Sequence, residues 1–163
     1  MKKITMKDVW EEKVSGYVRL FKYIIAVSEE IGEEKAWKLL ENMIKKKRFC
    51  WFEENKDKLN FKGTPVEQAY RIFYLEYLKI NPKDAKIIEK TKNKITTRWR
   101  NPCPVLEACK ILGLDTRKVC KKAYDLSAQA FISKINPNLR FKRNYNKIRP
   151  CADYCEETIE LIE

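Results

Sequence analysis

RWRNPCPVLEAC, residues 98–109, joins a strand pattern to a helix pattern. Alternating residues indicate a β-strand that runs toward Cys103, and Pro104 at a first helical position indicates that a helix begins directly afterwards. Free amides in the first turn of a helix favour anions, so we expect the Cys103 thiol to ionise easily. If Cys151 and Cys155 of CADYC return to the same place, the C-terminal half is a sheet-and-helix unit built over a cysteine site.

Helical periodicity dominates the chain before this junction. It predicts helices over residues 5–32, 33–44 and 64–81. The first begins with a capping box at Thr5 and Asp8, and the third begins with Thr64, Pro65 and Glu67, which supply a cap, a first-turn proline and an acidic third position.

After residue 82 the pattern alternates. Strands are predicted over 85–91 and 94–100, helices over 104–112 and 115–136, and strands over 139–145 and 154–162, with a turn at 147–150. The sequence therefore predicts an α+β fold in which helices cover an antiparallel sheet. We expect one domain over residues 1–163, with a helical part (1–82) and a cysteine-containing sheet-and-helix part (83–163).

The chain is strongly basic. Among 163 residues, 35 Lys and Arg oppose 23 Asp and Glu, which gives a net charge of +12. This charge favours an anionic partner, although a highly charged surface is equally typical of heat-adapted proteins. No apolar run is long enough to span a membrane and the N-terminus has no signal-peptide core, so we expect a cytoplasmic protein.

Histidine is absent from the sequence. Mechanisms that pair Ser or Cys with His are therefore excluded, and a zinc site is limited to Cys, Asp or Glu ligands.

Four cysteines form the predicted metal site. Strand parity points Cys103 and Cys155 toward the interior, and with Cys120 and Cys151 they make a set of four soft ligands suited to zinc. Packing as small apolar side chains and a Cys151–Cys155 disulfide are the alternatives. Cys50 and Cys109 lie within apolar patterns, and we assign both to core packing.

A catalytic role is a second possibility for the same region. Cys103 is the potential nucleophile, and Glu107 or Asp125 the potential general base. Glu107 lies one helical turn beyond Cys103, although an ordinary solvated helix face is the more common explanation for both acids. Tyr124 and Tyr145 are potential acids or hydrogen-bond donors to a ligand.

Basic residues alternate with aromatic residues in three places: 45–52, 98–100 and 139–145. Such alternation can pair with phosphates and stack bases, with Arg98, Arg100, Arg140 and Lys142 exposed on one surface. In a half-buried strand, however, Phe141 would point inward and could not stack on a base.

The C-terminal region resembles a known family. The residues that carry the likeness are Cys103-Pro104, Leu112-Gly113, Val119-Cys120 with Asp125, Asn136-Pro137, and the turn into Cys155. They resemble the C-terminal part of the vinyl-4-reductase-type domains, and the related aminothiazoline-carboxylate hydrolase-like proteins have a comparable layout. The resemblance implies an α+β small-molecule-binding domain, often a homodimer through its N-terminal helices, in which cysteines near the final hairpin hold a metal. The chain departs from the family pattern at Pro150-Cys151, where a glycine is usual, and at Glu156-Glu157, where an aromatic residue is usual.

These observations predict a small-molecule-binding domain with a zinc site. Its ligand would be small and hydrophobic or anionic. The expected pocket residues are Trp99, Tyr124, Phe131 and Tyr145. A thiol- or metal-dependent hydrolase of a small cyclic or anionic compound is the alternative, and a nucleic-acid-binding protein is the second alternative. The sequence leaves open whether the protein is an enzyme.

Overall fold

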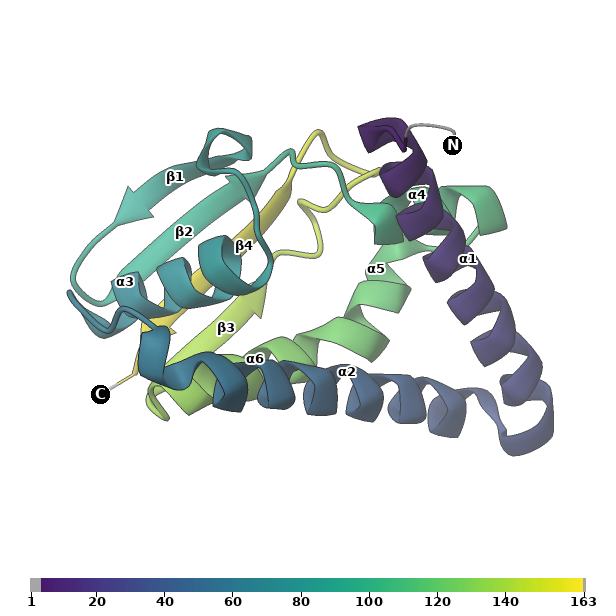
Figure 1. The fold of residues 1–163 in the computed structure, drawn as a ribbon, viewed down its shortest axis with the longest axis horizontal. Helices are drawn as coiled ribbons and strands as arrows, with labels where there is room; N and C mark the ends of the chain where they lie inside the picture. Colours follow the sequence, from purple (N-terminus) through teal and green to yellow (C-terminus); the bar gives the residue numbers. More distant parts are fainter. Residues whose placement is uncertain (1–3, 163) are drawn as a thin grey trace.

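The protein has an α+β fold, in which helices pack around a four-stranded antiparallel sheet (Figure 1). The structure, a computed structural model, describes residues 4–162. The helices are α1 (Met6–Ile31), α2 (Glu33–Asn55), α3 (Pro65–Ala69), α4 (Pro104–Leu112), α5 (Thr116–Val119) and α6 (Asp125–Ile135). Two π-helical segments, η2 (Tyr70–Tyr77) and η4 (Cys120–Tyr124), continue α3 and join α5 to α6, and η1 (Lys56–Lys58) and η3 (Pro82–Asp84) are short 3-10 turns. The strands are β1 (Ala85–Lys90), β2 (Lys94–Trp99), β3 (Leu139–Arg143) and β4 (Cys155–Leu161).

Both predicted capping boxes are present. The Thr5 hydroxyl accepts the amide of Asp8 at 3.2 Å, and the Thr64 hydroxyl accepts the amide of Glu67 at 3.4 Å. Gly32 separates α1 from α2. Its φ is 88°, a backbone angle that glycine adopts without strain and that would strain a residue with a side chain. The predicted starts of α1 and α3 are therefore confirmed.

Helix α2 continues past its predicted end, through the basic run and the aromatic cluster, to Asn55. The run Lys45–Arg48 consists of good helix formers and contains neither Gly nor Pro, so nothing stops the helix there. Arg48 and Phe52 are buried, which places this second half of α2 against the interior.

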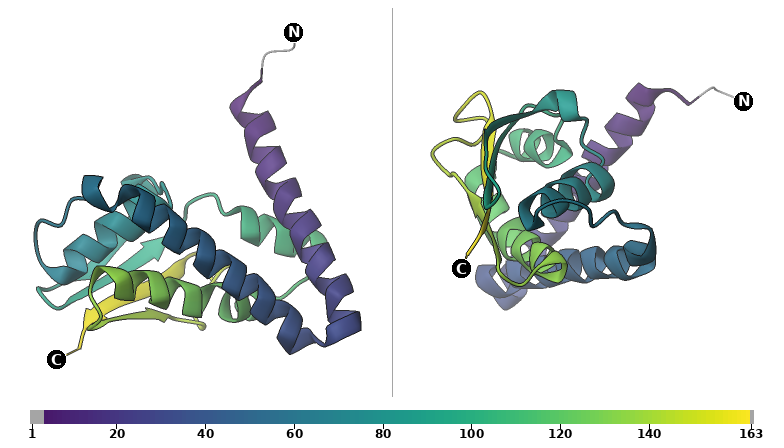
Figure 2. Two further views of the ribbon diagram at one scale, coloured as in Figure 1. Left: turned by 60° about the horizontal axis from the view of Figure 1, so that its bottom comes forward. Right: turned by 90° about the vertical axis from the view of Figure 1, so that its left-hand side faces the viewer.

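The strands are ordered β1-β2-β4-β3, and every neighbouring pair is antiparallel. The two predicted hairpins thus join through β2 and β4, where Trp99 lies opposite Cys155. The predicted strand parity is confirmed, since Ile95, Trp99 and Ile159 are buried on one face. Helices α3 and α6 lie against that face (Figure 2).

Two groups of buried apolar residues fill the interior. The first, the sheet core, includes Phe52, Phe73, Tyr74, Trp99, Phe131 and Ile159. The second, the helical core, includes Phe21, Trp37, Leu40, Val105, Cys109 and Val119. Helix α2 contributes to both cores, and Figure 2 shows it running alongside α6. Along α2, Arg48 lies between the residues that enter the helical core and those that enter the sheet core.

Within residues 4–162, every helix is too short or too polar to cross a membrane.

Candidate functional site

Cys103 is the residue at which the chain passes from β2 to α4. Its backbone is extended (φ −124°, ψ 108°), and its carbonyl accepts the amide of Glu107 at 3.2 Å. Pro104 occupies the first helical position, where the missing amide costs no hydrogen bond. The predicted change from strand to helix at Cys103 is therefore confirmed.

A pocket of about 540 Å³ opens beside Cys103. Its walls come from the start of α1, the β2–α4 connection, the first turn of α4 and the β3–β4 connection. The lining residues are Trp10, Arg100, Asn101, Pro102, Cys103, Leu106, Glu107 and Arg149. Two of the predicted catalytic residues, Cys103 and Glu107, therefore share one pocket.

Arg149 places a positive charge at this pocket, and not all of its hydrogen-bond donors have partners among the described residues. Its Nη1 donates to the carbonyl of Asn101 at 2.8 Å, and its Nη2 lies 3.4 Å from Oδ1 of the same residue. Its Nε is buried and finds no hydrogen-bond partner among the described residues. The carboxylate of Glu107 is already paired with Lys110 Nζ at 2.9 Å. The pocket thus favours a negatively charged occupant.

The environment of Cys103 acts on its ionisation in two opposing ways. Burial raises the pKa of the thiol above its ordinary value, while the backbone amides of Leu106 and Val105 and the charge of Arg149 oppose the rise. The amides at the helix start therefore act in the expected direction, but burial outweighs them. The expectation that Cys103 ionises easily is wrong.

Three of the four predicted metal ligands, Cys103, Cys120 and Cys155, are partly buried. Burial raises the pKa of Cys120 to about 12, and negative charge on Cys103 or Cys155 would raise it further. Negative charge on Cys155 would likewise raise the pKa of Cys103. Cys151 is exposed.

Throughout residues 4–162, no three Cys, Asp or Glu side chains are grouped closely enough to hold a metal ion. All six cysteines are free thiols, so the alternative Cys151–Cys155 disulfide is absent. The side chains as arranged do not form a four-sulfur site, and zinc binding stays a prediction.

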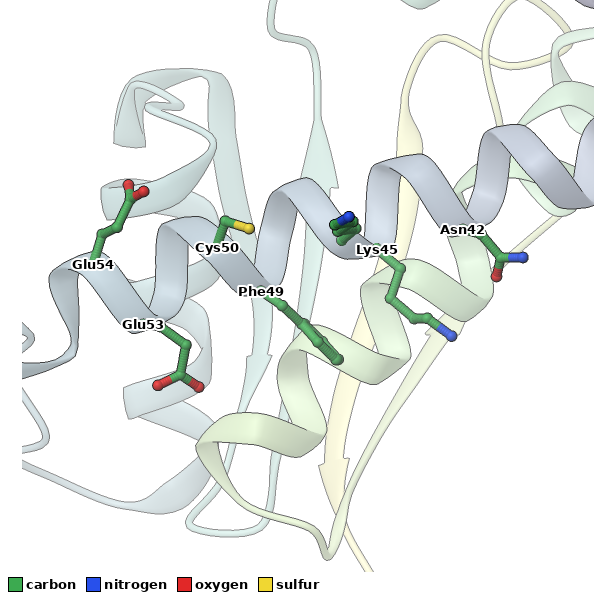
Figure 3. A pocket seen from close by; sticks show the side chains of 7 residues that line it. Asn42, Lys45, Phe49, Cys50, Glu53 and Glu54 are labelled. Atoms are coloured by element: carbon green, nitrogen blue, oxygen red, sulfur yellow. The ribbon is translucent and has the colours of Figure 1, made fainter.

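The two remaining cysteines differ from each other. Cys109 is buried in the helical core, as predicted, and burial raises its pKa to about 11. Cys50 is exposed on α2, so its assignment to core packing is wrong. Its two aromatic neighbours differ: Trp51 packs against the sheet core, whereas Phe49 lines the same shallow surface pocket as Cys50 (Figure 3). All lining residues of that pocket belong to α2, so it is a groove along one helix.

A hydrogen-bonded group of five side chains, here called the Arg143 network, lies under the sheet. Arg143 Nε donates to Glu157 Oε1 at 2.8 Å, and Tyr74 Oη donates to Glu157 Oε2 at 2.8 Å. Arg143 and Tyr145 also donate to Asp125. Burial raises the pKa of Asp125, and the charge of Arg143 opposes that rise. Asp125 is thus engaged by Arg143 and Tyr145, and it does not line the pocket beside Cys103.

The remaining predicted pocket residues do not line the pocket beside Cys103. Trp99 packs on Tyr74 with ring centroids 4.2 Å apart, and Phe131 is fully buried in the sheet core. Tyr124 lies near the boundary of the two cores, where its hydroxyl is buried and finds no partner among the described residues.

Sequence reasoning missed three arginines and one acid of the interior and the pocket: Arg48, Arg143, Arg149 and Glu157. Strand parity offered a signal for two of them, because Phe141 and Ile159 point inward and positions 143 and 157 share their faces. No comparable signal existed for Arg149, which lies in a connection without regular structure.

The basic face of the sheet is largely paired with acids. Arg98 Nε bonds Glu156 Oε2 at 2.8 Å, and Lys142 pairs with Glu160. Glu156 thus takes its partner from β2 rather than from β3. Phe141 is half-buried and packs against the sheet core, as predicted for a half-buried strand.

Comparisons with known proteins give little further guidance. No family model matches the chain, and no curated protein matches it. Among solved structures, the chain is similar to the crystal structure of a mutant Fe(II) unliganded H-NOX protein from K. algicida. The TM-score is 0.48 and the identity 14%, over 93% of this chain and 87% of that chain. A likeness at this level carries no conclusion about function.

Proposed function

We propose that the protein is a binding domain for a small anionic compound, and that the ligand occupies the pocket beside Cys103. The observation that carries the proposal is the guanidinium of Arg149, which Asn101 holds at the pocket wall and which pairs with no carboxylate among the described residues. An anionic ligand in the pocket would pair with this guanidinium through a charge-assisted hydrogen bond.

Other parts of the same pocket support an anionic ligand with an aromatic body. Arg100 adds a second positive charge, and the N-terminal end of α4 favours negative charge. Trp10, Pro102 and Leu106 supply an apolar wall. The ligand class that fits this combination best is a small aromatic carboxylate.

Calorimetric titration with benzoate tests the proposal, with benzamide as the neutral counterpart. We expect benzoate to bind and benzamide to bind far more weakly. Arg149→Met should raise the Kd for benzoate about tenfold or more, because it removes a hydrogen bond to a charged group. Arg140→Met removes the same charge from an exposed residue of β3 and should leave the Kd unchanged. Absence of benzoate binding, or equal Kd values for Arg149→Met and the unaltered protein, would contradict the proposal.

A thiol-dependent hydrolase is the second candidate, because Cys103 and Glu107 line the same pocket. Burial of the thiol weighs against it, since the thiolate is the nucleophile. Hydrolysis of p-nitrophenyl acetate separates the two candidates. An enzyme would show turnover that Cys103→Ser abolishes, whereas a binding domain would show no turnover that depends on Cys103.

A further inference from the structure

The outward face of α2 carries exposed apolar side chains. Leu39 is 50% exposed, Met43 is 60% exposed, and Cys50 is exposed as well. These three residues lie on one side of the helix, because spacings of four and seven residues return to nearly the same angle. The same side forms the shallow groove, of about 500 Å³, that Figure 3 shows. Apolar side chains gathered on one exposed face are typical of a contact surface.

Opposite charges lie at the two ends of this groove. Lys45 and Lys46 line its N-terminal end, and Glu53 and Glu54 line its C-terminal end. Lys46 and Glu54 are too distant to pair with each other, because eight residues of helix span about 12 Å. Among residues 4–162, the ion pairs of α2 involve neither of them. The groove therefore offers an unpaired cation at one end and an unpaired anion at the other.

A second copy of the chain complements this arrangement. Two α2 helices that meet antiparallel about a two-fold axis bring the two grooves together in opposite directions. With the axis between Phe49 and Cys50, Lys46 of one copy lies level with Glu53 and Glu54 of the other. The reverse pair forms at the same time, and Phe49 and Cys50 lie near their own counterparts at the centre. Each contact is therefore made twice.

Partners of uniform charge complement the groove less well. A basic segment would meet Lys45 and Lys46 with like charge, and an acidic segment would meet Glu53 and Glu54 with like charge. Like charges in contact oppose binding. An antiparallel copy of α2 meets both ends with the opposite charge.

We propose that the groove on α2 is a contact surface for a second copy of the chain, whose own α2 docks antiparallel across it. The resulting dimer is weak, because one helix face is a small surface, and contacts below about 1,200 Å² are typical of transient complexes. The surface is separate from the pocket beside Cys103, so the proposal goes beyond the proposed function and does not depend on it.

The overall charge sets the conditions under which the dimer forms. Each copy carries a net charge of +12, and repulsion between the two copies opposes association at low salt. At about 0.15 M salt this repulsion is screened beyond about 8 Å, whereas direct pairs at the contact are shorter than that distance.

Sedimentation equilibrium of the full chain at this salt concentration tests the proposal. We expect the mean mass to rise from monomer toward dimer as the protein concentration increases. Lys46→Glu sets acid against acid and Glu54→Lys sets base against base. Each should raise the Kd of the dimer about tenfold or more. An equimolar mixture of the two variants should associate again, because the reversed charges of the two copies are then opposite.

Lys22→Glu is the matched control, because it makes the same change of charge at an exposed residue of α1 outside the groove. It should leave the Kd unchanged. The proposal is overturned if the unaltered protein stays monomeric, if Lys46→Glu and Lys22→Glu give equal Kd values, or if the mixture associates no better than either variant alone.

Cys50 provides a second readout that needs no change of charge. In concentrated protein, a short bismaleimide should link two chains through Cys50, which lies near the two-fold axis. Cys50→Ser should abolish this link, whereas Cys151→Ser, at the other exposed cysteine, should not. In dilute protein the chain is monomeric and Cys50 stays accessible to small reagents. Links between chains that persist in Cys50→Ser would place the contact elsewhere and contradict the proposal.

Discussion

Arg143 on β3 donates from Nε to Oε1 of Glu157 on β4, at 2.8 Å, and both side chains lie in the interior. The two residues are also direct partners in the strand register. The pair links the backbone ladder of the sheet to the side chains packed beneath it, since Tyr74 bonds the same carboxylate and Asp125 the same guanidinium.

Replacement of Glu157 by Gln should destabilise the fold substantially. It leaves the buried charge of Arg143 with Asp125 as its remaining acidic partner, and breaking a buried ion pair costs about 3 kcal/mol. Urea denaturation measures the loss. Glu156→Gln removes a carboxylate that pairs with Arg98 on the outer face and should cost less than about 1 kcal/mol. Equal losses for the two variants would show that the Arg143 network does not stabilise the interior.

Stability should depend on pH through Glu67. Hydrogen bonds from Lys90 and Thr64 lower the pKa of this carboxyl from 4.5 to about 2. A carboxyl whose pKa is lower in the folded state stabilises the fold above its unfolded pKa, and the benefit is lost as pH falls from 4.5 toward about 2. Glu67→Gln should therefore have a lower urea midpoint than the unaltered protein near neutral pH, and the difference should narrow with acidification. A difference that stays constant over this range would contradict the role of Glu67.

The cysteines should differ in reactivity toward iodoacetamide. Cys50 and Cys151 are exposed, whereas burial raises the pKa of Cys109 to about 11 and of Cys120 to about 12. Because the thiolate is the reactive form, the exposed pair should be labelled first in the folded protein and the buried pair only on unfolding. Peptide mass spectrometry at increasing times measures this order. Rapid labelling of Cys103 would favour the hydrolase over the binding domain.

Zinc binding can be tested by elemental analysis of protein purified without added metal. The sequence predicts about one zinc per chain. Cys155→Ser should lower the zinc content, and Cys50→Ser, at an exposed residue of α2, should leave it unchanged. A folded, metal-free preparation would exclude the predicted site.

Local signals made much of the fold predictable. The capping boxes at Thr5 and Thr64 fixed two helix starts, and alternation identified the strands and their inward faces. The end of α2 was missed because basic and aromatic residues were interpreted as a change of structure, although they are compatible with a helix. The pairing of β2 with β4 joins distant parts of the chain, and strand periodicity alone does not specify a partner.

The candidate site was predictable only in part. The helix start placed Cys103 correctly, and Glu107 followed from one turn of helix. How easily the Cys103 thiol ionises was not predictable, since its burial depends on which residues the whole fold packs around it. Cys151 was expected to join Cys103, but it lies exposed in the irregular connection between β3 and β4. Arg48 belongs to a basic run that was interpreted as able to pair with phosphates, yet it follows Leu40 and Ile44 at helical spacing, which was the available signal for its burial.

Helix α2 supplies Trp37 and Leu40 to the helical core and Phe52 to the sheet core. The helical core also needs Val105 and Val119, which come from much later in the chain. Cutting the polypeptide near residue 82 would therefore expose apolar surface of both cores on each fragment. We expect neither fragment to be stable in isolation, and the intact chain to melt in a single cooperative step.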